Sequence, residues 1–306
     1  MDLGIEIGGT KLQVAIGDPL TGKIDQIYRF QVEKALGAEG ILAQIEKTLR
    51  ALPYPPTRIG IGFGGPVNRI TGVIATSHQI GGWSGFGLTH WFRTRFDASV
   101  FIDNDANVAA LGEAHFGAGK SYKQVFYITL GSGVGGGLVC DRALYHGNAP
   151  GEAEVGLLQL DRQGNNLESF CSGWALDAKI RKLLPALPSE SKLKQLVGFQ
   201  QSGEAQFILP ALNQGDHHAA ELLSEYADTL AWGLSHVVHL INPQIIVLGG
   251  GVSLIGEALR VRVQEALPKY LVKAFQPGPL VALAELKEET VLVGALCLLN
   301  QRTEPI

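Results

Sequence analysis

The sequence predicts an α/β protein that carries two related β-sheet domains. A chain of 306 residues is long enough for two domains, at roughly 100 to 200 residues each. Hydrophobic residues make up 46% of the chain, which is enough to fill sizeable cores. Glycine is unusually frequent, with 39 residues or about 13%, against about 7% in an average protein. These glycines must therefore serve particular backbone positions.

The glycines concentrate in four turns, each of which follows a β-branched, strand-like run. The runs span residues 3–7, 58–62, 125–130 and 245–248, and the turns are Gly8-Gly9-Thr10, residues 60–65, residues 131–137 and Gly249-Gly250-Gly251. Two of these strand-and-turn units repeat each other, because residues 5–18 align with residues 128–141 without a gap. The repeat predicts a duplicated domain.

The spacing of the turns predicts an insertion in the second half. Gly8 and Gly131 lie 123 residues apart, whereas Gly64 and Gly250 lie 186 apart. If the halves are duplicates, the second holds about 63 additional residues, which we place at about 150–230. Sequence in this region has a helical rather than a strand-like pattern, as expected of an insertion.

Charge and cysteine content exclude several classes of protein. The net charge of −4 and a pI near 6.1 leave no basic surface for nucleic acid or for an anionic membrane. The three cysteines share no C-x-x-C spacing, which favours a reducing cytoplasm over a disulfide framework or a structural zinc site. We expect no export signal, because the N-terminal residues lack a basic region followed by an apolar one. The apolar run 291–299 is shorter than the ~20 residues of a membrane span and predicts a buried terminal helix.

Two of the glycine turns are candidate phosphate sites. Turns of Gly, Ser and Thr expose successive backbone N–H groups, and the missing Cβ lets phosphate oxygens approach closely. A single turn of this kind is more often a simple tight connection. Two related turns favour a polyphosphate site, whose candidate residues are Gly8, Gly9, Thr10 and Lys11 in the first turn and Gly131, Ser132 and Gly133 in the second.

Glu6 is the candidate carboxylate for a metal ion, and Asp105 is the candidate catalytic base. Glu6 lies in an otherwise apolar strand, where an isolated carboxylate is costly, and we expect it to hold Mg²⁺ through water. Asp105 lies among the polar residues that end the β-rich run 100–107. Carboxylates at the carboxyl end of a strand face the ligands of open α/β sheets, so Asp105 is placed to accept a hydroxyl proton. Helix capping would explain Asp105 or Asn107 singly, but not the whole polar group.

Glu154 and Glu168 are candidates for binding sugar hydroxyls. Both lie in the expected insertion, among several glycines. Ionised carboxylates accept charge-assisted hydrogen bonds from hydroxyl groups, which suits them to a neutral sugar. Taken singly, each is equally consistent with a solvated loop residue.

The motifs follow one another in a recognisable order. They are Glu6-Ile-Gly-Gly-Thr-Lys11, Gly64-Gly-Pro-Val67, Asn104-Asp-Ala-Asn107, Gly131-Ser-Gly-Val-Gly-Gly136, Gly151-Glu-Ala-Glu-Val-Gly156, Leu167-Glu168 with Ser172-Gly173, and Leu248-Gly-Gly-Gly-Val252. This ordered set resembles the ROK family of sugar kinases, repressors and open-reading-frame proteins, within the hexokinase, actin and Hsp70 superfamily. The resemblance covers nearly the whole chain.

The resemblance implies a two-lobed, actin-like (ribonuclease-H-like) fold with a hinge cleft. It further implies Mg²⁺- and ATP-dependent phosphorylation of a hexose, usually at the 6-hydroxyl, by a homodimer. We expect a small lobe of residues 1–116 with the terminal helix at about 290–306, and a larger lobe of residues 117–289 that carries the insertion. The resemblance makes Asp105 the base, places Gly65, Gln79, Asn104, Glu154 and Glu168 at the sugar, and places Gly249, Gly250 and Gly251 beside the adenosine.

Four departures from the family pattern bear on function. Glu6 replaces the family's Asp, and Leu157 stands where most members have His. Residues 161–166 contain no cysteine where relatives have a cysteine cluster, so we predict that the usual structural zinc is absent. Gln79 occupies a position where relatives have Asn.

The sequence therefore predicts a cytoplasmic hexose kinase, with glucose as the first acceptor and no nucleic-acid or membrane partner. Fructose, mannose and N-acetylated hexosamines remain open as acceptors, and inorganic polyphosphate remains open as the donor. A sugar-sensing repressor would need an added N-terminal DNA-binding region, which the strand starting at Leu3 disfavours. A sugar-binding relative without catalysis is the remaining alternative, motivated by Glu6 and Leu157.

Overall fold

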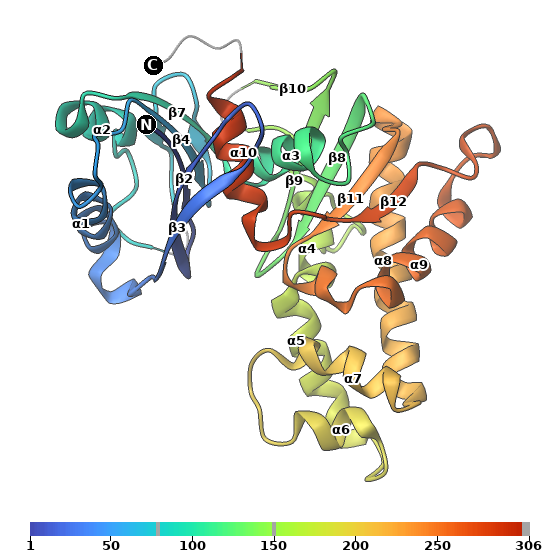
Figure 1. The fold of residues 1–306 in the computed structure, drawn as a ribbon. Helices are drawn as coiled ribbons and strands as arrows, with labels where there is room; N and C mark the ends of the chain where they lie inside the picture. Colours follow the sequence, from blue (N-terminus) through green and yellow to red (C-terminus); the bar gives the residue numbers. More distant parts are fainter. Residues whose placement is uncertain (78–79, 149–150, 302–306) are drawn as a thin grey trace. The chain divides into compact units, whose positions relative to one another are not determined.

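The computed structural model describes residues 1–77, 80–148 and 151–301, which form an α/β fold (Figure 1). The strands are β1 (Asp2–Ile7), β2 (Lys11–Gly17), β3 (Ile24–Gln31), β4 (Arg58–Phe63), β5 (Val67–Asn68), β6 (Val73–Ile74), β7 (Ser99–Asn104), β8 (Gln124–Leu130), β9 (Val134–Cys140), β10 (Ala143–Leu144), β11 (Ile245–Gly249) and β12 (Leu280–Leu283). The α-helices are α1 (Gly37–Arg50), α2 (Leu88–Phe96), α3 (Asp105–Phe116), α4 (Leu167–Cys171), α5 (Gly173–Leu183), α6 (Lys192–Val197), α7 (Ile208–Asn213), α8 (His217–Ile241), α9 (Glu257–Ala266) and α10 (Thr290–Leu298). The four strands predicted before the glycine turns are confirmed as β1, β4, β8 and β11.

The chain divides into two compact units, each discontinuous in sequence. Unit 1 comprises Met1–Lys123, Gly137–Ala153 and the residues from Glu285 onward, and unit 2 comprises Gln124–Gly136 and Glu154–Ala284. The chain therefore passes from one unit to the other four times.

The two main sheets have the same topology, which confirms the predicted duplication. Their strand orders are β3-β2-β1-β4-β7 and β10-β9-β8-β11-β12. In the first sheet β2 is antiparallel to β1 and β3, whereas β4 is parallel to β1 and β7. In the second, β9 and β10 are antiparallel, whereas β11 is parallel to β8 and β12. The strand-and-turn unit of β1 thus corresponds to that of β8.

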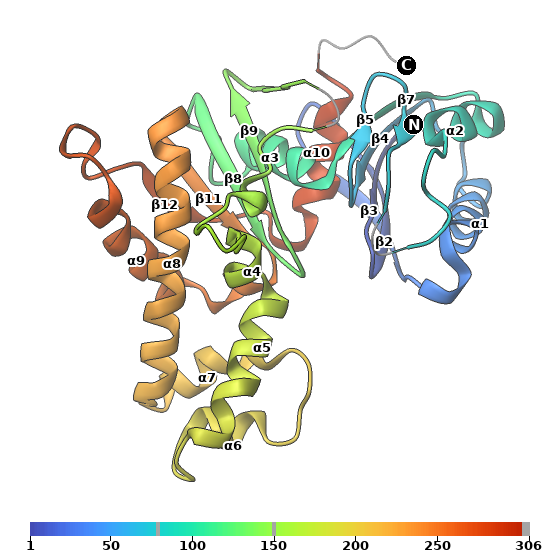
Figure 2. The same cartoon turned by 180° about the vertical axis from the view of Figure 1, so that it is seen from behind.

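Helices cover both faces of the sheet in unit 1. Helices α1 and α2 pack on one face, and α3 and α10 on the other (Figures 1 and 2). A Cβ atom on Gly60 of β4 would lie 1.8 Å from the backbone oxygen of Ala295, so this glycine allows α10 to approach the sheet closely. Helix α10 is buried along almost its whole length, as predicted for the terminal apolar run.

Unit 2 contains the additional residues of the second half. Between β10 and β11 the chain forms α4 to α8, whereas the equivalent connection between β3 and β4 contains α1 as its α-helix. Helices α5, α6 and α7 gather at the lower end of the long helix α8 in Figure 1. No helix within the described ranges combines the length and apolar character needed to cross a membrane.

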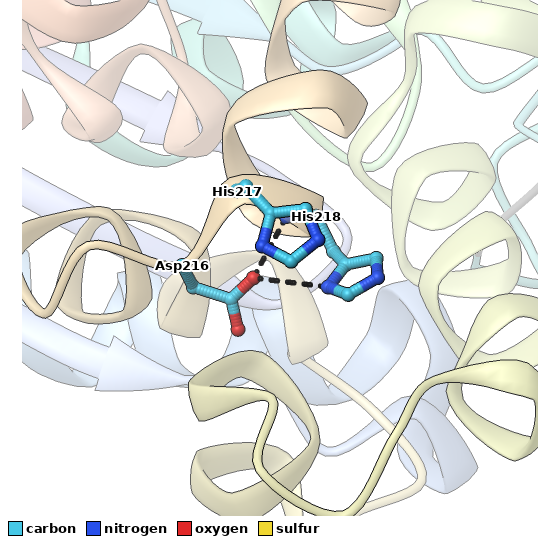
Figure 3. Close-up of side chains that lie close together, drawn as sticks. All are labelled: Asp216, His217 and His218. Atoms are coloured by element: carbon cyan, nitrogen blue, oxygen red, sulfur yellow. Dashed lines mark hydrogen bonds and ion pairs between the residues drawn. The ribbon is translucent and has the colours of Figure 1, made fainter.

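Asp216 joins the starts of α6 and α8 in unit 2, beside the imidazoles of His217 and His218 (Figure 3). One carboxylate oxygen accepts the backbone N–H groups of His218 and Ala219 at 2.8 and 3.1 Å. The other accepts the hydroxyl of Ser191 and the backbone N–H of Leu193 at 2.7 and 2.8 Å. Burial alone would raise the pKa of Asp216, but these hydrogen bonds outweigh it and lower the pKa to about 2.

This lowered pKa predicts a dependence of stability on pH. Because the folded-state pKa lies below the unfolded value, the stabilisation is complete above pH ~4 and decreases as the pH falls toward 2. It amounts to about 2 kcal/mol at pH 7, and roughly half should remain at pH 3. Urea unfolding of the wild type and of Asp216→Asn should therefore show a stability difference that narrows between pH 7 and pH 3. A stability difference between the two proteins that does not change with pH would show that the lowered pKa of Asp216 is not its cause.

Candidate functional site

Three parallel strands of unit 1 end together at one edge of the sheet. Their last residues, Ile7 of β1, Phe63 of β4 and Asn104 of β7, lie opposite one another in the strand register. The segments that follow them are the first glycine turn, the Gly64-Gly65 turn and the start of α3. Ligands of α/β sheets bind beyond the carboxyl ends of parallel strands, so this edge is the candidate site.

In unit 1, Gly64 lies beside both the Gly8 turn, which is the candidate phosphate site, and Asp105, which is the candidate base. Its backbone N–H donates to the oxygen of Ile7 at 2.8 Å. A Cβ atom at this position would lie 3.4 Å from Asp105 Oδ2 and 3.4 Å from the Cα of Gly8. The Asp105 carboxylate and the Gly8 turn therefore both border the space that a side chain at Gly64 would fill.

Asn104 and Asp105 occupy the start of α3. Asn104 is the N-cap, since its side-chain oxygen accepts the backbone N–H of Ala106 at 2.9 Å. Its Nδ2 donates to the oxygen of Gly65 at 3.2 Å. The capping role considered for Asp105 or Asn107 thus falls to Asn104, and Asp105 lies in the first turn, where the helix dipole favours a negative charge.

Glu6 is buried in β1 but has partners. The Lys11 ammonium lies 3.1 Å from one carboxylate oxygen, and Gln13 Nε2 donates to the other at 2.7 Å. Burial raises the pKa of Glu6, and the positive charge of Lys11 opposes that increase. These two contacts offset part of the cost of burying the carboxylate.

The second glycine turn lies at the equivalent edge in unit 2. The N–H of Gly131 donates to the oxygen of Gly133 at 2.9 Å, which closes the turn after β8. The N–H of Gly173, the first residue of α5, donates to the oxygen of Gly131 at 2.7 Å. This helix N-terminus therefore begins directly beside the candidate phosphate turn.

Glu168 also contacts this turn. Its Oε2 accepts the backbone N–H of Val134 at 2.8 Å, and a Cβ atom on Gly133 would lie 2.5 Å from the same oxygen. Glu154 precedes the short 3-10 helix η2 (Val155–Leu157) in unit 2. Asn104 and Asp105 belong to unit 1, whereas Glu154 and Glu168 belong to unit 2.

Gly250 packs tightly against the backbone of β8. It has φ +81°, and a Cβ atom there would lie 2.6 Å from the backbone N and C atoms of Leu130. Gly251, the next residue, would place a Cβ with no heavy atom of the described residues within 4 Å. The two adjacent glycines therefore differ sharply in the space around them.

This contrast predicts different effects of two alanine substitutions. Gly250→Ala should destabilise the protein by about 1–3 kcal/mol, because the new methyl group meets backbone and the left-handed conformation is strained. Gly251→Ala should change stability by less than about 0.5 kcal/mol. Denaturant unfolding of both variants checks this, and equal destabilisation would contradict the packing described.

Two further positions at which the chain departs from the family pattern can be located in the structure. Leu157 ends η2 with 59% of its surface exposed. Asp161 closes the loop that follows, since its carboxylate accepts the backbone N–H groups of Gln163 and Asn165 at 2.8 and 3.0 Å. Gln79, predicted to contact the sugar, lies outside the described residues.

Sequence reasoning missed three polar residues beside the unit 1 site. Asp103, His146 and Glu152 have side-chain ligand atoms that all lie within 4.8 Å of one another. Asp103 directly precedes the recognised Asn104-Asp105 pair, and Glu152 lies inside the recognised Gly151–Gly156 motif. Asp103 and Glu152 could have been found from these neighbouring motifs, but no motif lies next to His146.

The duplicated sheets, with glycine turns at equivalent strand ends, define a protein of the actin-like ATPase fold. The chain belongs to the ROK family, whose family model matches residues 2–302.

Its relatives include enzymes and regulators. The chain is 29% identical to the glucokinase of Thermotoga maritima, over 98% of this chain and 97% of that protein. It resembles a ROK family glucokinase from Streptomyces griseus, solved in complex with glucose and AMPPNP, with a TM-score of 0.83, 28% identity and coverage of 96% and 97% of the two chains. It is also 26% identical to the xylose repressor of Caldicellulosiruptor bescii, over 83% of this chain and 66% of that protein.

Proposed function

We propose that this protein is a hexose kinase that transfers a phosphoryl group from ATP to the 6-hydroxyl of a hexose, with glucose as the first acceptor to test. The observation that carries the proposal is the position of the Asp105 carboxylate, which borders Gly64 as the Gly8 turn does. A kinase needs a proton acceptor next to a phosphate cradle, and the carboxylate and the glycine turn at this edge of the sheet are suited to those roles. The similarity to glucokinases supports the same activity.

Asp105 is the proposed catalytic base. It accepts the proton of the sugar hydroxyl as that oxygen attacks the terminal phosphorus, a contribution of roughly 10² to 10⁴ in rate. Asn104 and Gly65 hold the sugar beside it, and their mutual hydrogen bond at 3.2 Å fixes their positions. We also assign Glu154, Glu168 and Gln79 to the sugar, as acceptors or partners of its other hydroxyls.

The glycine turns are the proposed nucleotide site. Backbone N–H groups of Gly8, Gly9 and Thr10 and of Gly131, Ser132 and Gly133 hold phosphate oxygens, and Lys11 adds a positive charge. Gly249, Gly250 and Gly251 adjoin the adenosine. Transfer then depends on positioning and charge stabilisation more than on covalent chemistry with the protein.

Glu6 fits a supporting role toward Mg²⁺. This ion typically binds one or two carboxylates together with substrate phosphates and several waters, and Glu6 supplies one carboxylate in the strand that leads to the Gly8 turn. Its present partners, Lys11 and Gln13, favour contact through water rather than direct coordination. When bound, Mg²⁺ neutralises the charge of the phosphates. We propose no structural zinc, because Leu157 and residues 161–166 supply neither imidazole nor thiol.

A coupled assay tests the activity. Purified protein with Mg²⁺ is offered ATP or inorganic polyphosphate and a panel of glucose, fructose, mannose and N-acetylated hexosamines. Turnover with ATP and glucose above the other sugars is the expected result. Absence of turnover on every sugar, with sugar binding intact by calorimetry, would overturn the kinase proposal and favour a sugar-binding relative.

We also propose that the protein acts as a cytoplasmic homodimer. Light scattering coupled to size-exclusion chromatography checks the assembly, with a mass of two chains expected.

A further inference from the structure

A partly buried hydrogen-bond network adjoins the proposed sugar residue Asn104 in unit 1. It consists of Asp103, Asn107, His146 and Glu152, which we call the Asp103 network. His146 Nε2 donates to Asp103 Oδ2 at 2.7 Å, and Asn107 Nδ2 donates to Asp103 Oδ1 at 2.9 Å. The same Nδ2 donates to Glu152 Oε1 at 2.6 Å. The amide of Asn107 therefore bridges two carboxylates.

The carboxylate oxygens of the network are all engaged in hydrogen bonds, whereas Asn107 Oδ1 is buried without a partner among the described residues. Each carboxylate oxygen of Asp103 and Glu152 accepts at least one N–H group, since Glu152 Oε2 accepts the backbone N–H of Gly147 at 3.2 Å. A metal ion would have to displace these donors. The arrangement favours a structural connection between residues 103–107 and two later positions, His146-Gly147 and Glu152.

The first of these segments carries the proposed sugar and base residues. Asp103 Oδ1 also accepts the backbone N–H of Asn104 at 2.7 Å, so this carboxylate holds the residue that caps α3. Asp105 follows directly in the chain. With 5% of its surface exposed, Asp103 has little freedom to move unless His146 and Asn107 move with it.

The second segment leads into unit 2. Glu152 is followed by Ala153, the last residue of unit 1, which has φ +55° although it is not a glycine. Glu154, assigned above to the sugar, is the first residue of unit 2 on this passage. Hydrogen bonds from Asn107 and Gly147 to Glu152 thus fix the chain two residues before Glu154.

We propose that His146 and Glu152 are positioning residues for the acceptor sugar, acting through Asp103 and Asn107. This inference rests on the proposed function, because it assumes that Asn104, Asp105 and Glu154 contact the sugar. The imidazole of His146 fixes the Asp103 carboxylate, which fixes Asn104. The carboxylate of Glu152 fixes the amide of Asn107 and the passage toward Glu154.

His146→Ala and Glu152→Ala test the proposal. Each should raise the sugar KM and the sugar Kd roughly tenfold, the equivalent of one lost hydrogen bond, while the KM for ATP stays within about twofold. His146→Gln should restore much of the sugar affinity, because its Nε2 can donate to Asp103 as the imidazole does. His115→Ala is the matched control, since His115 is a partly buried imidazole of unit 1 bonded to the backbone oxygen of Arg142 at 2.8 Å.

The readouts separate this proposal from the proposed function. Sugar Kd is measured by calorimetry without nucleotide, so it reports positioning even if the wild type does not phosphorylate any hexose. Equal loss of affinity in His146→Ala, His146→Gln and His115→Ala would overturn the positioning role, as would a rise in both KM values. Stoichiometric metal in the purified wild type that is lost in His146→Ala would also overturn it, in favour of coordination.

Discussion

Asp105→Asn is expected to lower kcat by about 10² to 10⁴-fold while leaving the hexose Kd within a few-fold. The amide keeps the size and hydrogen-bonding shape of the side chain but cannot accept the hydroxyl proton. The carboxylate and the Gly8 turn both border Gly64, where we propose that the hydroxyl and the phosphoryl group meet. Steady-state kinetics and calorimetry on the same protein check the two parts of this prediction.

Asp97→Asn provides the matched control. Asp97 is exposed, lies just before the opposite end of β7 and has φ 51°, a conformation that asparagine tolerates well. Its substitution should leave kcat and Kd unchanged. An unchanged kcat in Asp105→Asn would remove Asp105 as the base, and a large rise in Kd would assign it to binding instead.

Glu113→Gln is expected to destabilise the protein by about 2–3 kcal/mol, because it leaves one of two sets of hydrogen-bond donors without an acceptor. Glu113 is fully buried in α3. Its Oε2 accepts the backbone N–H groups of Ala118 and Glu285 at 2.8 and 3.1 Å, and its Oε1 accepts that of Leu286 at 2.9 Å. A glutamine amide would point an N–H₂ group at one of these sets of donors.

Glu285 and Leu286 are the residues at which the chain re-enters unit 1, so the loss should loosen the attachment of α10. Chemical denaturation monitored by circular dichroism measures the effect. Glu33→Gln serves as the control, because Glu33 is exposed and its side chain makes no cap hydrogen bond. A loss below about 1 kcal/mol would show that the Glu113 hydrogen bonds are readily replaced by water.

Much of the fold followed from local sequence signals. Strand-like runs that end in glycine turns predicted β1, β4, β8 and β11, because β-branched residues and glycines act within a few positions of the chain. The aligned segments 5–18 and 128–141 predicted the duplication that the two strand orders confirm. The sheet edge at which Asn104 and Asp105 lie was also predictable from local sequence, since polar residues at the end of a strand mark a ligand-facing edge.

Other features depended on contacts between distant residues. Nothing near Glu113 in the chain indicates that it would accept N–H groups at positions 285 and 286, more than 170 residues away. His146 meets Asp103 across 43 residues, in a segment that returns to unit 1 at Gly137, within β9. The contact of Glu168 with the Gly131–Gly133 turn likewise joins an inserted helix to a strand end.

The amino-acid sequence by itself determined the duplicated α/β fold, the glycine turns and the Asn104-Asp105 pair, because these arise from periodicity and backbone preferences that are local. Only the tertiary structure decided which buried carboxylates hold which segments, and where the chain passes between its two units. Those choices depend on burial, where an unpaired charge or N–H group is costly and each must find a partner wherever the fold brings one. Asp105 could therefore be named from the residues next to it in the sequence. His146 and Glu113 could be recognised only from the residues that the fold places in contact with them.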